Sequence, residues 1–162
     1  YSMIEREKIV GTHYAGSEEE VRALNAFIKL TRATESLNAA MNSLLSDAGL
    51  TVSQFGTLEV LYHLGPLCQS QIGDKILKSG GNMTLVIDNL EKRGLVRRER
   101  DAHDRRQITV HLTEAGRHLI ADYLPQHVAV ITELLGALSP QEQEQLGALC
   151  KTLGLHLRSV AG

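Results

Sequence analysis

The most informative part of the chain, Gln69 to Thr113, reads QSQIGDKILKSGGNMTLVIDNLEKRGLVRRERDAHDRRQITVHLT. Two short helical patterns, separated by a turn with two glycines, lead directly into a hairpin with a basic tip. This order is typical of a helix-turn-helix followed by a β-wing, which places one helix in the DNA major groove and a charged loop beside it. The stretch therefore predicts a DNA-binding fold.

The charge of this stretch differs from that of the whole chain. The 162 residues carry a formal net charge of −2, whereas residues 69–113 contain nine Lys or Arg and six Asp or Glu, a net charge of +3. A basic segment in an acidic molecule gives a directed electrostatic footprint, as expected of a protein that binds nucleic acid with one face. A solvated surface of the same charge is the alternative that composition leaves open.

Composition excludes several classes of protein. The apolar fraction of 43% suits one globular domain or two small lobes, and the longest apolar runs fall short of the ~18 residues needed to span a bilayer. We also find no basic-then-apolar leader, and the two cysteines, Cys68 and Cys150, are too few and too far apart for a disulfide scaffold. We therefore expect a cytoplasmic protein that does not contact membranes.

The residues also argue against catalysis and metal binding. The histidines at 111, 118 and 127 lack the i, i+4 spacing that places two imidazoles on one helical face. We find neither a nucleophile–base set nor a glycine-rich phosphate loop. We expect no enzyme activity, no cofactor and no metal.

Periodicity on both sides of the central stretch predicts the remaining elements. Capping signals at Ser17, Thr51 and Ser139 begin helices, Gly94 ends one, and Pro125 should kink or locally break another. The alternation of Ile108, Val110 and Leu112 indicates a half-buried strand. The predicted helices cover residues 17–49, 51–64, 70–77, 82–93, 113–138 and 139 onward, and the hairpin covers 95–112. The fold class is mainly α with a small β-hairpin wing, a six-helix winged helix-turn-helix.

The helix over residues 82–93 has two different faces. Met83, Val86, Ile87 and Leu90 form an apolar stripe, and Leu85 lies on the opposite face. In a recognition helix the first turn reaches base edges, and a leucine packs on a thymine methyl group. The alternative is an exposed leucine of no special role.

Arg105 and Arg106 lie at the return of the hairpin loop, where a guanidinium can enter the minor groove. Asp104 is placed to hold Arg106 through a bidentate ion pair. Taken alone, the loop is equally compatible with a solvated tip whose surface ion pairs contribute little. The side chains that we expect to contact DNA are Ser79, Asn82, Met83, Thr84, Leu85, Asn89, Lys92, Arg97, Arg105 and Arg106.

The same residues resemble the MarR family of winged-helix transcription regulators. The resemblance rests on NLEKRGLV at residues 89–96, Asp104-Arg105-Arg106, and VHLTEAG at residues 110–116, and it covers essentially the whole chain. The segment GGNMTLVIDNLEKRGLV is similar to members that respond to quinones or related electrophiles. One departure is Leu85, because many members carry a basic or polar residue there.

The resemblance implies a homodimer on a pseudo-palindromic operator. Residues 1–50 and 114–162 would form the helical dimerisation region, and residues 51–113 the winged helix-turn-helix. It also implies that Arg106 enters the minor groove while Asp104 orients it, and that a small ligand or thiol oxidation releases the DNA.

The residues that would sense such a signal are less well defined. Cys68, in the joint that leads into the helix-turn-helix, is the candidate redox thiol, although an inert buried thiol is the competing interpretation. A small aromatic acid or phenol would bind between the two lobes, and its candidate contacts, each also compatible with packing or surface, are Arg32, Tyr62, His63 and Tyr123. We predict a DNA-binding repressor; the alternative is a winged-helix module that contacts protein instead of DNA.

Overall fold

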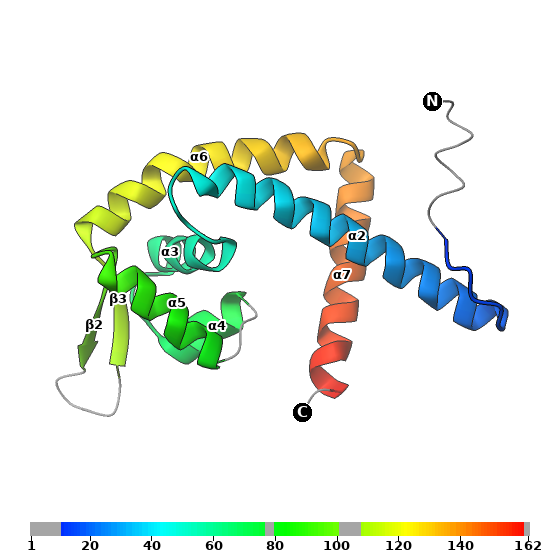
Figure 1. The fold of residues 1–162 in the computed structure, drawn as a ribbon, viewed down its shortest axis with the longest axis horizontal. Coiled ribbons are helices and arrows are strands. Elements are labelled where there is room, and N and C mark those ends of the chain that lie inside the picture. Colours follow the sequence, from blue (N-terminus) through cyan, green and yellow to red (C-terminus); the bar gives the residue numbers. More distant parts are fainter. Residues whose placement is uncertain (1–10, 77–79, 101–107, 161–162) are drawn as a thin grey trace. The chain divides into compact units, whose positions relative to one another are not determined.

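The computed structural model describes residues 11–76, 80–100 and 108–160 (Figure 1). Six helices lie within these ranges: α2 (Glu18–Ser46), α3 (Val52–Leu64), α4 (Gln69–Ile76), α5 (Gly80–Lys92), α6 (Glu114–Leu135) and α7 (Pro140–Val160). Strands β1 (Leu67–Cys68), β2 (Val96–Arg100) and β3 (Ile108–Leu112) form one antiparallel sheet with β3 in the centre. The predicted fold class is confirmed.

Three helices begin where the capping signals predicted. The Ser17 hydroxyl accepts a hydrogen bond from the Glu20 amide at 3.3 Å, and the Glu20 carboxylate accepts one from the Ser17 amide at 2.8 Å. The pairs Thr51–Gln54 and Ser139–Glu142 form the same reciprocal box. Each box satisfies two of the amides that a helix leaves without partners at its start.

The structure differs from the predicted elements in three places. Strand β1 was not predicted; it has only two residues, and it exists because Leu67 and Cys68 pair with Val110 and Thr109 of β3. Helix α5 begins at Gly80, two residues before its predicted start, because the first amides of a helix need no helical acceptor and tolerate glycine. Helix α6 contains Pro125, as predicted, but ends at Leu135, three residues before its predicted end.

The wing is closed onto the end of α5 by Thr113 and Gly116. The Thr113 hydroxyl donates to the Gly94 carbonyl at 2.6 Å and accepts from the Gly116 amide at 3.1 Å. A Cβ at Gly116 would collide with the carbonyl oxygen of Leu95, so this close approach requires glycine. Gly94 itself has a φ of +68°, the left-handed conformation predicted for the residue that ends α5.

The chain divides into two compact units, residues 1–117 and 118–162. In the first unit, a core of apolar side chains joins α3, α4 and α5 to the sheet. Its fully buried members include Leu58 of α3, Ile72 of α4, Ile87 of α5, and Val96 and Val110 of the sheet. In the second unit, α7 has no buried residue along its whole length. Among the helices of the described ranges, none is long and apolar enough to cross a membrane.

Candidate nucleic-acid interface

Helix α5 has one buried and one exposed face, as its periodicity predicted. Met83, Ile87 and Leu90 have no exposed surface, and they fix the helix against the core of the first unit. On the other face, the Leu85 side chain is 62% exposed. A leucine this exposed on an otherwise well-packed helix offers an apolar contact to a partner molecule.

The polar residues of α5 surround Leu85. Asn82, Thr84 and Lys92 are exposed, and Asn89 is half-buried. An open cavity of about 290 Å³ runs from this face to the first turn of α3, where Thr51, Ser53 and Gln54 complete its lining. The exposed face of α5 therefore continues into an open groove with both apolar and polar lining.

Burial corrects one of the predicted DNA contacts. Met83 is fully buried because it shares the apolar stripe with Ile87 and Leu90, so its side chain supports the helix and is not available to DNA. Four other predicted residues lie outside the described ranges, namely Ser79, Asp104, Arg105 and Arg106.

The base of the wing carries a cluster of charged and polar side chains. Arg97 of β2 is half exposed and forms an ion pair with Glu99. Glu99 also approaches His111 Nε2 to 3.1 Å, and His111 contacts the Thr109 hydroxyl at 2.9 Å. Burial, and then the nearby charge of Arg97, lower the pKa of His111. The permanent cation of this cluster is Arg97, whose side chain is half exposed at the base of the wing.

Arg98 is a structural residue that the sequence interpretation missed. Its guanidinium donates to Asp88 Oδ1 and Glu91 Oε2, both at 2.6 Å, and its amide donates to Glu91 Oε1 at 2.9 Å. Burial opposes the charge of Arg98, but these carboxylates outweigh that effect and raise its pKa. The ion pairs attach β2 to α5. Strand alternation was the available signal, because it places Arg98 on the same face as the buried Val96.

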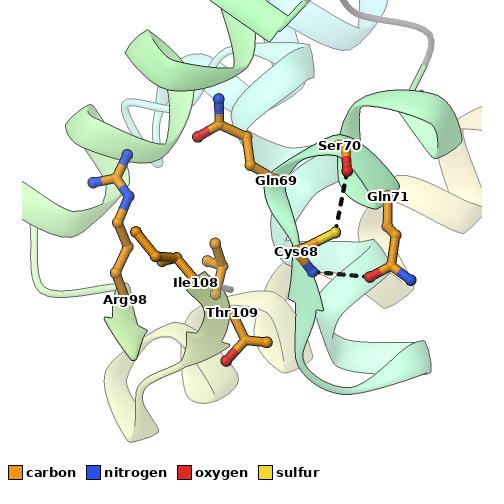
Figure 2. Close-up of a pocket in the computed structure, with 8 residues that line it drawn as sticks. Cys68, Gln69, Ser70, Gln71, Arg98, Ile108 and Thr109 are labelled. Carbon is orange, nitrogen blue, oxygen red and sulfur yellow. Dashed lines mark hydrogen bonds between the residues drawn. The ribbon is translucent and has the colours of Figure 1, made fainter. Parts of the chain in front are cut away.

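A cavity of about 620 Å³ lies between the start of α4 and the wing strands (Figure 2). Cys68 lines it on one side, and Arg98, Ile108 and Thr109 line it on the other. The Cys68 thiol lies 3.1 Å from the Ser70 hydroxyl, and this hydrogen bond, followed by the backbone of Gln71, lowers its pKa. A thiol with a lowered pKa has more of the reactive thiolate form near neutral pH.

This cavity is connected to α5 through Gln69. The Gln69 side-chain amide donates to the Thr84 hydroxyl at 2.7 Å, so the residue next to Cys68 contacts the first half of α5. A change at the thiol therefore has a short path to the exposed face of the helix.

The four predicted ligand contacts are not gathered at the described cavities. Tyr62 and His63 are neighbours at the end of α3, with ring centroids 5.3 Å apart, and Arg117 lies over the Tyr62 ring. Arg32 is exposed on α2, and Tyr123 belongs to the second unit. The three cavities described in this part of the chain are lined by other residues, so a shared ligand site stays a prediction.

The sequence of the chain is similar to those of known transcriptional regulators. The sequence model of the MarR family matches residues 50–108. The HTH-type transcriptional regulator MhqR of Bacillus subtilis is 39% identical over 137 residues, which cover 85% of this chain and 94% of that protein.

Two solved structures share both fold and sequence with the chain. MepR of S. aureus, in complex with DNA, is 26% identical with a TM-score of 0.71, and the match covers 77% of this chain and 93% of that one. BpsR of Bordetella bronchiseptica, whose DNA binding is regulated by 6-hydroxynicotinic acid, has the same identity and TM-score, with coverage of 77% and 95%. These relatives are regulators, which disfavours the alternative of a winged-helix module without DNA binding.

Proposed function

Because the chain belongs to the MarR family of transcriptional regulators, we propose that it acts as a homodimeric repressor, with α5 in the major groove of a pseudo-palindromic operator. The observation that carries this proposal is that α5 has one buried face and one exposed face. A fully buried stripe fixes the helix, and its opposite face presents Leu85 among polar side chains next to a basic hairpin. This arrangement suits the reading of base edges.

The terminal helices support the homodimer. Leu149 of α7 is 70% exposed, and Leu153 and Leu157 lie at helical spacing from it. Phe27 of α2 is 65% exposed. Because a contiguous apolar surface is rarely left in water, we assign residues 1–50 and 114–162 to the dimer interface and residues 51–113 to DNA.

Each predicted contact has a chemical role at the operator. Asn82 and Thr84 hydrogen-bond bases or phosphates, and Leu85 packs on a thymine methyl group. Asn89, Lys92 and Arg97 contact the flanking DNA backbone, as does Ser79, which precedes α5 in the sequence. In the wing, Arg105 and Arg106 approach the minor groove and Asp104 orients Arg106; this part of the proposal rests on the sequence resemblance alone.

Release from DNA is proposed to follow binding of a small aromatic or phenolic ligand, or oxidation of Cys68. The lowered pKa of the Cys68 thiol and its place in the cavity beside Gln69 support the second route. The first route has Arg32, Tyr62, His63 and Tyr123 as its candidate contacts, and it is supported by the BpsR relative, whose DNA binding responds to 6-hydroxynicotinic acid.

The proposal is tested by measuring operator affinity for the Arg106→Ala protein. We first select sites from random duplex DNA with the unmodified protein, and expect a palindromic site whose log affinity falls linearly with log salt concentration. Arg106→Ala should bind this site about tenfold to a hundredfold more weakly while remaining a dimer. Arg158→Ala, which removes an arginine from the last turn of α7, is the matched control.

Two results would contradict the proposal. Binding by Arg106→Ala at full affinity would show that this residue of the wing does not contribute to operator binding. Salt-independent binding, or selection that enriches no sequence, would favour the protein-interaction alternative.

A further inference from the structure

Arg93 joins two helices that are distant in the sequence. It directly follows the last residue of α5, and its guanidinium donates to the carbonyls of Gly49 at 2.7 Å and Ala48 at 2.9 Å. These two carbonyls lie just beyond the end of α2. The C-terminal end of the proposed recognition helix is therefore attached to the C-terminal end of the first long helix.

The end of α2 needs a cation that its own sequence does not supply. The helix has 29 residues, no basic residue in its last turn, and Asp47 as its C-cap. A helix end carries partial negative charge, which a nearby cation stabilises. Since Arg93 donates two charge-assisted hydrogen bonds there, it supplies that cation from another part of the chain.

The backbone on both sides of this contact is fixed. After α2, the Leu50 amide donates to the Leu45 carbonyl at 3.1 Å, and Gly49 has a φ of +61°. After α5, the Leu95 amide donates to the Leu90 carbonyl at 3.0 Å. Both chain turns are closed by their own hydrogen bonds, so the Arg93 side chain connects two rigid ends.

The two arginines near the end of α5 therefore have different partners. Arg98 binds Asp88 and Glu91 and attaches α5 to the wing, within the segment assigned to DNA binding. Arg93 attaches the same helix to α2, which we have assigned to the dimer interface. The Arg93 contact therefore links α5 to α2 directly, in addition to the buried stripe that holds α5 on the core.

We propose that Arg93 is a positioning residue that sets the separation of the two recognition helices, and so the half-site spacing that the dimer accepts. This inference rests on the proposed function. A dimeric helix-turn-helix protein reads two half-sites about one DNA turn apart, so the angle between α5 and α2 determines which spacing fits. The residue itself does not touch a base.

The test is selection of sites from random duplex DNA by the full-length protein and its variants. The unmodified protein should enrich one half-site spacing and bind a site lengthened by one base pair much more weakly. Arg93→Ala should enrich several spacings, and its discrimination between the two lengths should fall about fivefold. Arg93→Lys, which keeps the charge and one donor group, should restore part of the discrimination.

Lys92→Ala is the matched control, because it removes a neighbouring exposed cation from the same helix end. Because Lys92 is proposed to contact a phosphate, Lys92→Ala should weaken binding to every spacing equally and reduce the slope of log affinity against log salt by about one. Thermal melting and solution mass establish that each variant is folded and dimeric.

The outcomes separate the inference from the proposed function. Arg93→Ala selecting the same single spacing with unchanged discrimination would overturn the inference, and so would an equal loss at all spacings. Failure of the unmodified protein to enrich any two-half-site sequence would instead contradict the proposed function. If Arg93→Ala unfolds, the comparison is made with Arg93→Lys, for which unchanged discrimination would count against the inference.

Discussion

The winged helix-turn-helix of residues 51–113, here called the reader, buries its apolar side chains, whereas the last helix, α7, leaves its apolar side chains exposed. Eleven of the fourteen buried apolar residues of the described chain lie between Leu50 and Val110, whereas α7 has none. Helix α7 nevertheless contains Leu146, Leu149, Leu153 and Leu157, a stripe as apolar as that of α5. The difference teaches that the core of the reader is closed within the described chain, whereas α7 leaves its leucines exposed there, as the proposed dimer interface requires.

The first prediction tests whether the exposed leucines of α7 form the dimer interface. Leu149→Asp places a charge in the proposed dimer interface of both subunits, and burial of an unpaired carboxylate is unfavourable. We expect a folded monomer in analytical ultracentrifugation and an operator affinity reduced by at least about a thousandfold, or about 4 kcal/mol, because one half-site is lost.

A matched variant makes this result specific. Lys151→Asp introduces the same side chain on the other side of α7, away from the leucine stripe, and should leave both the dimer and the operator affinity nearly unchanged. A dimeric Leu149→Asp protein with full affinity would show that the dimer forms through another surface.

The second prediction tests the reader in the same way. Ile87 is fully buried, so Ile87→Ala should lower the free energy of unfolding by about 3 kcal/mol through lost burial and the remaining cavity. Urea denaturation at equal protein concentration measures this change, because the stability of a dimer depends on concentration. The solution mass should stay that of a dimer.

Val86→Ala is the control for the second prediction, since Val86 is only half-buried on the neighbouring side of α5. Its effect on the free energy of unfolding should be clearly smaller than that of Ile87→Ala. Equal effects of the two substitutions, or a monomeric Ile87→Ala protein, would contradict the assignment of the reader as a self-contained core.

Local signals in the sequence predicted most of the fold. The stripe of α5, the end of that helix at Gly94 and the alternation of β3 are each set within about ten residues, so periodicity and backbone preference reveal them. Strand β1 was missed for the opposite reason. It has two residues, and only pairing with β3, some forty positions later, makes it a strand.

The partners of charged residues were much harder to predict. Arg93, Arg97 and Arg98 belong to the same basic stretch, yet one caps α2, one pairs with Glu99 on the wing, and one is held by Asp88 and Glu91. Charge alone does not identify a partner, because tertiary packing determines which carboxylate or carbonyl comes within reach. Met83 is a different case, because the apolar stripe already placed its side chain on the buried face, and its prediction as a DNA contact went against that pattern.

The third and smallest effect distinguishes the cysteines of the two regions. The Cys68 thiol faces the cavity of the reader, and its pKa is lowered by the Ser70 hydroxyl, whereas Cys150 is exposed on α7. The thiolate adds to a ring carbon of 1,4-benzoquinone, forming a C–S bond while the electrons move to a carbonyl oxygen, which takes up one proton from solvent. The hydrogen of the attacked carbon then moves as a proton to the other oxygen, which gives a substituted hydroquinone. We expect the Cys68→Ser protein to require about tenfold more quinone for release from the operator, a difference of about 1.4 kcal/mol.

Cys150→Ser is the control and should be released like the unmodified protein. The rate of Cys68 modification should rise with pH and reach half of its maximum at a lower pH than for an ordinary thiol, because its lowered pKa makes the thiolate available at lower pH. The adduct would occupy the cavity next to Gln69 and disturb its hydrogen bond to Thr84. Release of Cys68→Ser at the same quinone concentration would instead point to a ligand that acts without a covalent bond, and the four candidate contacts outside the cavity would become the residues to substitute.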